Sequence, residues 1–356
     1  MEREQASKFL QDLLKLMVAR NGSDLFLTAE FPPAFKIDGR VQPVSNVALS
    51  PQHTLELARA VMNDRQAAEF EAHKEVNFAI SPGSIGRFRV NAFMQQGRVG
   101  LVLRTINTEI PTFEQLQLPP ILKELALTKR GLMIVVGATG SGKSNSLAAI
   151  VGHRNEHSQG HIVTIEDPVE FVHPHRHCIV THRDVIMIGE IRDRETMEHA
   201  VAFAETGHLC LATLHSNSAN QALDRIINFF PEERRAQLLM DLSLNLRAIV
   251  SQRLIPMASG SGRVPAVEIL LNSPLIADLI FKGEVGSIKE VMKKSRELGM
   301  KTFDQALFEL YEENRISYED ALRNADSVND LRLNIKLNSK RGERDLNSGI
   351  EHLGIV

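Results

Sequence analysis

The segment that most constrains the fold of this chain is Gly137–Ser144, with the sequence GATGSGKS. It fits the phosphate-binding pattern GxxxxGK[ST], in which glycines let the backbone curl and point successive N–H groups at a phosphate. An apolar run, Leu132–Val136, leads into this segment, and a helical stretch through Leu147 and Ile150 leads out of it. A strand, a glycine-rich turn and a helix in this order form the context of a nucleotide-binding loop. The sequence therefore predicts a P-loop NTPase.

The expected ligands of this loop are ATP and Mg²⁺. We expect Lys143 to reach the β- and γ-phosphates and the Ser144 hydroxyl to bind the Mg²⁺ ion. The other predicted nucleotide contacts are Gly137, Ala138, Thr139, Gly140, Ser141, Gly142 and Asn145.

Two further apolar runs end in carboxylates. Ile186–Glu190 has the form of a Walker B segment, whose terminal Glu190 would orient the attacking water or a Mg²⁺-bound water. Thr164–Glu166 precedes it in the chain, and Glu166 is predicted to join the same metal and water network. Because parallel strands open their carboxyl ends on one edge, where ligands bind, both carboxylates are expected near the phosphate loop.

One histidine and two arginines complete the candidate site. His208–His215 is an apolar run with a histidine at each end, and His215 would lie at the carboxyl edge, able to sense the γ-phosphate. Arg87 and Arg104 lie on an alternating pair of strands in the N-terminal part. Arginines on a strand face commonly serve only solubility, whereas in a two-domain NTPase they can act as arginine fingers that close over the phosphates.

The length of 356 residues favours two domains over one. Residues 1–105 predict a small α+β domain, and the proline-bearing segment 106–120 predicts an interdomain linker. In residues 121–273 continuous apolar runs alternate with helical stretches, which predicts an α/β fold with a parallel sheet covered by helices. Residues 274–337 have a helical pattern throughout, with helices expected near Leu275–Lys282, Ile288–Leu298, Thr302–Asn314 and Tyr318–Leu337. Residues 338–356 are expected to form a flexible tail.

The predicted sheet contains a topological break between Val185 and Ile186. Residues 178–185 have a strand pattern, and the next buried strand begins at once. Two parallel strands need a crossover of about a dozen residues or more. Either these runs form one unusually long strand or a segment is missing between Val185 and Ile186, and the sequence favours the missing segment.

The net charge and the distribution of apolar residues limit the kinds of partner that the sequence predicts. The formal net charge of −3 gives no basic character, so no nucleic-acid partner is predicted. The N-terminal segment has charges inside its apolar run and no small-residue cleavage site, so it does not predict a signal peptide. No apolar stretch approaches the ~20 residues of a membrane span. We expect a cytoplasmic protein whose membrane contact goes through a partner.

Five segments together resemble one known family: GATGSGKS, TIEDPVEFVH, IMIGEIRDRET, AETGHLCLATLHSNSANQALDRIINFFP and NGSDLFLTAEFPPAFKIDGRV. They resemble the type IV pilus retraction ATPases, which are the PilT/PilU family within the type II/IV secretion ATPase superfamily, and the PilU branch most. The resemblance covers about residues 4–337. It implies an N-terminal PAS-like domain and a C-terminal RecA-like motor domain, assembled as a ring hexamer. It also implies docking on an inner-membrane pilus platform protein at the inner face of that membrane, and pilus retraction for twitching motility in support of a primary retraction ATPase of the PilT type.

The resemblance further implies roles for particular residues. By this resemblance the segment Thr164–His173 is the Asp box and Glu190 is the Walker B glutamate. His208 and His215 belong to the His box, and Arg87 and Arg104 contact phosphates.

The chain departs from the family pattern at three places. Asn145 stands where the family has threonine, and the stretch expected between Val185 and Ile186 is absent. Near Ile276–Ile280 the Ala-Ile-Arg signature of the primary retraction motors is also absent, which favours the PilU branch.

Two alternatives stay open. The first is a pilus-assembly or type II secretion ATPase. Those enzymes usually carry a four-cysteine zinc site, which Cys178 and Cys210 alone cannot supply. The second is a nucleotide-gated scaffold subunit that hydrolyses ATP poorly, although the presence of Glu190, Glu166 and His215 argues against it.

Overall fold

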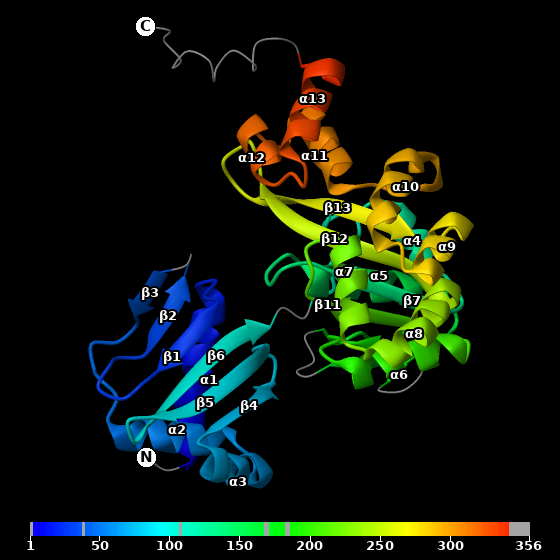
Figure 1. Cartoon of the computed structure of the whole chain (residues 1–356). Helices are drawn as coiled ribbons and strands as arrows, with labels where there is room; N and C mark the ends of the chain where they lie inside the picture. The colour runs from blue at the N-terminus through cyan, green and yellow to red at the C-terminus, as the bar shows by residue number, and fades with distance from the viewer. Residues whose placement is uncertain (1–2, 38–39, 107–108, 167–170, 182–185, 342–356) are drawn as a thin grey trace, which may run out of the picture. The chain divides into compact units, whose positions relative to one another are not determined.

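The computed structural model describes residues 3–37, 40–106, 109–166, 171–181 and 186–341. These residues form two compact units (Figure 1). The first consists of the described residues up to Glu109 together with Phe171 and Val172, and the second consists of the other described residues from Ile110 onward.

The first unit is an antiparallel sheet with helices packed on it, which is the α+β organisation expected for the N-terminal part. The strand order is β3-β2-β1-β6-β5-β4. The strands are β1 Asp24–Leu27, β2 Ala34–Ile37, β3 Arg40–Pro43, β4 Glu75–Ile80, β5 Arg87–Gln95 and β6 Arg98–Ile106, and the helices are α1 Arg3–Ala19, α2 Pro51–Val61 and α3 Asp64–His73. Helix α1 buries Leu10, Leu14 and Met17, which recur at the spacing of one helical face.

The second unit is built on a largely parallel sheet with the order β13-β12-β7-β11-β10-β8-β9. Its strands are β7 Gly131–Val136, β8 Gly160–Ile165, β9 Cys178–Thr181, β10 Ile186–Ile188, β11 Leu209–Leu214, β12 Leu246–Pro256 and β13 Arg263–Leu271. Strand β12 is parallel to β7, and β13 returns antiparallel to β12 as the other arm of a hairpin. The predicted α/β fold with a parallel sheet is confirmed.

Both faces of the central strand β7 are buried, which explains its unbroken apolar run. Leu132, Ile134 and Val136 pack in one core with helices α6 to α10, whereas Met133 and Val135 pack in another core with α4 and α5. The helices on the two faces (Figure 1) are α4 Ile121–Ala126, α5 Lys143–His157, α6 Arg194–Glu205, α7 Ala219–Asn228, α8 Glu232–Asn245, α9 Pro274–Lys282 and α10 Ile288–Lys294.

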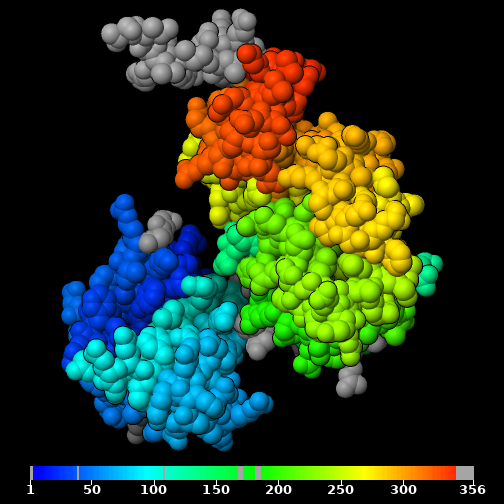
Figure 2. All heavy atoms as spheres, in the orientation of Figure 1, coloured from blue at the N-terminus to red at the C-terminus, as the bar shows by residue number. Residues whose placement is uncertain are grey.

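The last helices form a separate cluster on the β12–β13 hairpin. They are α11 Phe303–Glu312, α12 Tyr318–Arg323 and α13 Val328–Asn338. Phe303, Leu307 and Tyr311 of α11 pack against Ile255 and Val264 of the hairpin. In Figure 2 these helices, orange to red, lie directly on the yellow hairpin.

The sequence pattern predicts one helix over Tyr318–Leu337, and this expectation is wrong. The structure has two helices, α12 and α13, because the side chain of Ser327 caps a new helix start by accepting a hydrogen bond from Asp330 N at 3.4 Å. Of the predicted tail from Asn338, only the residues up to Arg341 are described. The Arg341 Nη1 atom donates to Tyr311 O at 2.6 Å, so this part of the segment packs on α11.

Strands β9 and β10 lie on opposite sides of β8, and both are parallel to it. A chain that passes from the end of β9 to the start of β10 must therefore cross β8, although Thr181 and Ile186 are only five positions apart. The predicted break falls in this connection, and Val185 lies outside the described residues.

Within the described ranges, no helix combines the length and the apolar character needed to cross a bilayer.

Candidate active site

The predicted phosphate loop connects β7 to α5 at the centre of the sheet. Val136, the last residue of β7, is paired with Leu214 of β11 and Ser251 of β12. Gly140 and Gly142 have φ of +79° and +89°, a left-handed conformation that side chains with a Cβ rarely adopt. Helix α5 begins at Lys143 with no side-chain cap on its first turn. Its first N–H groups and the helix dipole therefore suit an anion.

Glycine is also required at Gly137 for steric reasons. A Cβ there would lie 2.4 Å from Ser141 Oγ and 2.6 Å from Gln252 O. The Lys143 ammonium donates to the carbonyl oxygens of Gly137 at 2.9 Å and Ala138 at 3.1 Å, so it lies over the concave side of the loop.

The remaining loop residues differ in exposure. Ala138, Thr139, Gly140 and Asn145 are exposed, whereas Ser144 is half-buried at the start of α5. Ser141 is buried, and its carbonyl oxygen accepts a hydrogen bond from Gln252 of β12.

The structure brings Glu190 and His215 together from two neighbouring strand ends. Glu190 follows β10, His215 follows β11, and the distance from His215 Nε2 to Glu190 Oε1 is 3.0 Å. The other carboxylate oxygen of Glu190 accepts a hydrogen bond from Arg192 Nε at 2.7 Å. The Glu190 side chain is 22% exposed, so it is held from both sides yet still reaches the surface of the carboxyl edge.

Glu166 lies beyond this pair along the same edge. It follows β8, which pairs with β10 through Ile165 and Ile188. A Cβ on Gly189 would lie 3.6 Å from Glu166 Cα, so the two strand ends are adjacent. In the strand order Glu166 is three strands from the phosphate loop, about 14 Å at ordinary strand spacing. That backbone separation is larger than one bridging water spans, and the role of Glu166 in the metal and water network stays a prediction.

His208 lies apart from this cluster, and Arg87 and Arg104 lie in the first unit. His208 O accepts a hydrogen bond from Gly131 N at 2.9 Å, which puts His208 at the amino end of β11, at the sheet edge opposite His215. Arg87 and Arg104 lie in the first unit, where Arg104 Nε donates to the buried Asp24 at 2.7 Å. Their contact with phosphates stays a prediction.

Gln252 is a candidate site residue that the sequence pattern does not reveal. Its Nε2 donates to Ser141 O at 2.8 Å, and its Oε1 accepts from Ser146 Oγ at 2.6 Å. Both bonds are buried, and they join β12 to the phosphate loop and to the first turn of α5. The available signal is a polar triplet, Ser251–Arg253, between the apolar residues 248–250 and 254–256.

Replacing Gln252 by leucine is expected to weaken nucleotide binding by about 10-fold or more. The change leaves Ser141 O and Ser146 Oγ buried without these partners, at a cost of about 1–3 kcal/mol for each group, and it loosens the loop that is predicted to receive the phosphates. Isothermal titration with ADP measures the effect.

Asn155→Leu is the matched control for Gln252→Leu. Asn155 is a buried amide near the other end of α5, and it donates to Pro174 O at 2.7 Å. We expect this control to lower the melting temperature while leaving ADP affinity unchanged. Equal loss of ADP affinity in both variants would show that Gln252 acts through general stability.

Cys210 is unsuited to metal binding or nucleophilic chemistry. It lies fully buried on β11, and burial raises the pKa of its thiol to about 12. At neutral pH the thiol keeps its proton, and only the thiolate acts as a metal ligand or nucleophile.

The sequence matches the family described as "Type II/IV secretion system protein" over residues 2–183 and 176–274. The type IV pilus ATPase PilU of Pseudomonas aeruginosa is 58% identical, in an alignment that covers 97% of this chain and 96% of that protein. The type IV pilus retraction ATPase PilT of the same organism is 37% identical, with 89% and 98% covered. Among solved structures, the crystal structure of the pilus retraction motor PilT with bound ADP has a TM-score of 0.84 at 36% identity, with 91% of this chain and 98% of that chain covered.

The predicted phosphate loop and the paired Glu190 and His215 at the carboxyl edge thus occur in a chain that matches such ATPases along nearly its whole length. The chain belongs to the type II/IV secretion system protein family and, within it, to the PilT/PilU family of type IV pilus ATPases.

Proposed function

We propose that this ATPase powers type IV pilus retraction as an accessory motor that assists a primary retraction ATPase of the PilT type. The observation that carries the proposal is the 58% identity with PilU over nearly the full length of both chains. The absence of the Ala-Ile-Arg signature near Ile276–Ile280 supports the accessory role.

Deleting the gene and measuring surface piliation and twitching tests this function. Retraction predicts excess surface pili with reduced movement, restored by the wild-type gene and not by a Glu190→Gln copy. Loss of surface pili in the deletion strain would contradict the proposal and indicate an assembly ATPase.

For the site, we assign binding of Mg²⁺ to the Ser144 hydroxyl, with Glu190 and Glu166 acting through water. Hydroxyl and carboxylate oxygens are the hard donors that Mg²⁺ prefers, so the residues present fit this ion. When bound, the ion supplies neutralising charge at the phosphates. In this proposal Glu190, which lies between His215 and Arg192, accepts a proton from the attacking water, and His215 stabilises charge at the γ-phosphate.

We further infer a ring hexamer in the cytoplasm that docks on an inner-membrane platform protein. In this arrangement Arg87 and Arg104 contact phosphates from the N-terminal unit and link nucleotide state to domain rotation. The exposed guanidinium of Arg104 supports such a contact, since its side chain is 66% exposed despite the ion pair with Asp24.

The natural chain is also proposed to contain a crossover between β9 and β10. The two strands flank β8 in parallel, and the family match is split into two pieces that meet near residues 176–183. The alignment with PilU runs over 366 residues, whereas 97% of this chain is about 345 residues, so about 20 positions have no counterpart here. An encoded sequence that joins Val185 directly to Ile186 would refute this proposal.

A further inference from the structure

Two side chains of the β12–β13 hairpin hold the loop that carries His215. This loop, residues 215–218 between β11 and α7, is called the β11–α7 loop below. Arg253 of β12 donates from Nη2 to Asn217 O at 2.9 Å. Glu268 of β13 accepts from Ala219 N, the first residue of α7, at 2.8 Å. A third contact comes from within α7, where Arg225 Nη1 donates to His215 O at 2.8 Å.

Arg253 also binds the C-terminal helices. Its Nη1 donates to Asn324 O at 2.7 Å, and its Nη2 contacts Asp326 Oδ1 at 2.7 Å. The guanidinium lies 3.9 Å from the ring centre of Phe303, the first residue of α11. One planar group with five donors therefore bridges the β11–α7 loop and the segment between α12 and α13, which a lysine could not do in the same geometry.

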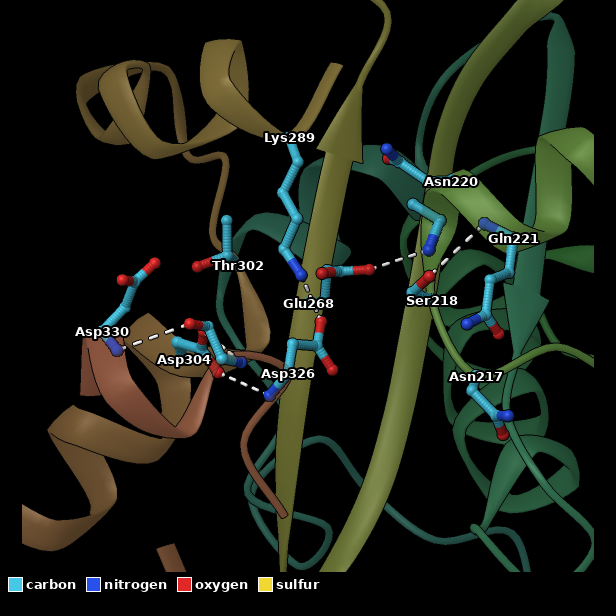
Figure 3. A network of polar contacts seen from close by, with 12 residues as sticks. Asn217, Ser218, Asn220, Gln221, Glu268, Lys289, Thr302, Asp304, Asp326 and Asp330 are labelled. Atoms are coloured by element: carbon cyan, nitrogen blue, oxygen red, sulfur yellow. Dashed lines mark hydrogen bonds and ion pairs between the residues drawn. The ribbon is translucent and has the colours of Figure 1, made fainter. Parts of the chain in front are cut away.

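The segment between α12 and α13 is itself fixed by acidic side chains. Asp304 of α11 accepts from Asp326 N at 2.8 Å and from Ser327 N at 3.1 Å. Lys289 of α10 contacts the second carboxylate oxygen of Asp326. Figure 3 shows this arrangement, with Glu268 on its strand between Ser218 and Asn220 on one side and Lys289, Thr302 and Asp304 on the other.

Glu268 is almost fully buried at the centre of this network, with 1% exposure. The pKa of its carboxyl group is raised, chiefly by burial and also by the nearby Asp326 carboxylate, although the N–H groups of Ala219 and Phe303 and the Lys289 ammonium lower it. Replacing a buried ionisable side chain by an apolar one of similar size commonly leaves the stability of a protein unchanged or raises it. Its contacts to the first residues of both α7 and α11 give Glu268 a specific use as a link between the two helices.

We propose that Arg253, supported by Glu268 and Asp326, is a positioning residue that ties the β11–α7 loop to helices α11 to α13. The placement of these helices then sets the placement of His215 beside Glu190, and a shift of the helices changes the rate of hydrolysis. The inference rests on the role proposed above for His215.

Asp326→Asn tests the link from the side remote from the nucleotide, and Arg253→Lys tests its centre. Both keep side-chain size close to the original, and Arg253→Lys also keeps the charge. Glu309→Gln is the matched control, since Glu309 is a carboxylate of α11 that binds two cations, Arg296 at 2.6 Å and Lys301 at 2.5 Å. It has no hydrogen bond or ion pair to the β11–α7 loop among the contacts of the described residues.

Two readouts separate the link from the role of His215. Hydrogen–deuterium exchange over residues 215–222 reports whether the loop is loosened, and steady-state kinetics report kcat and KM for ATP. For Asp326→Asn and Arg253→Lys we expect faster exchange in this segment, a kcat lowered about 10-fold and an unchanged KM, because a small displacement of a positioned group affects the reaction step. In a His215→Ala background the same substitutions are expected to lower kcat no further.

Unchanged exchange in both variants, or the same change in Glu309→Gln, would overturn the link. Faster exchange with unchanged kcat would instead overturn the role of His215 in hydrolysis. A full additional loss of kcat in the His215→Ala background would contradict the claim that Arg253 acts through this loop.

Discussion

Replacing Lys143 by alanine is expected to abolish measurable nucleotide binding. The Lys143 ammonium lies over the phosphate loop, within hydrogen-bond distance of Gly137 O and Ala138 O. Its loss removes charge-assisted hydrogen bonds to phosphate worth about 1.5–3 kcal/mol each. Two such bonds amount to a loss of about 10²–10⁴-fold in affinity. Equilibrium binding of a fluorescent ATP analogue measures it.

The fold should survive this substitution, because Lys143 is the first residue of α5 and alanine is a good helix former. Lys129→Ala is the matched control, since Lys129 is an exposed lysine in the same unit that precedes β7. Wild-type affinity in Lys143→Ala would refute the assignment of the loop as the phosphate site.

Glu190→Gln is expected to bind ATP with near wild-type affinity and to hydrolyse it at least about 100-fold more slowly. The amide keeps the size of the side chain but cannot accept a proton from the attacking water, and general-base catalysis typically contributes 10²–10⁴-fold. Single-turnover hydrolysis together with equilibrium ATP binding separates the two effects.

Glu195→Gln serves as the control for Glu190→Gln, because Glu195 lies on the first turn of α6 and, among the described residues, does not pair with His215 or Arg192 as Glu190 does. Turnover within a few-fold of wild type in Glu190→Gln would assign the catalytic base elsewhere. If neither the wild-type chain nor Glu190→Gln hydrolysed ATP, the result would favour the nucleotide-gated scaffold alternative.

The parts of the site that follow from local pattern could be predicted from the sequence. The glycines, Lys143 and Ser144 of the phosphate loop have fixed spacing, and continuous apolar runs mark the strands on either side. Because those strands are parallel, the sequence also predicts that the residues following β10 and β11 share one edge. The 3.0 Å contact between Glu190 and His215 agrees with that expectation.

The β12–β13 hairpin and its contacts could not be predicted in the same way. In β12 the polar Ser251, Gln252 and Arg253 interrupt the apolar run, so the strand pattern is weak. Gln252 and Arg253 are tolerated there because Gln252 binds the phosphate loop and Arg253 binds the β11–α7 loop and Asp326. Such partners are remote in sequence, and only the folded sheet identifies them.

The first unit also contains elements that could not be predicted from the sequence pattern. The sequence pattern does not predict helix α3, in which polar residues dominate, or strand β4, which is only six residues long. Capping and pairing stabilise them instead. The Asn63 side chain accepts from Gln66 N at 2.9 Å to start α3, and β4 is paired along its length with β5.

A crystal structure with a non-hydrolysable ATP analogue and Mg²⁺ tests the central claim most directly. The account predicts the triphosphate within the Gly137–Ser144 loop, Mg²⁺ on the Ser144 hydroxyl, and Glu190 facing the γ-phosphate across one water molecule. A nucleotide bound elsewhere, with that loop empty and Glu190 turned away from it, would contradict the account.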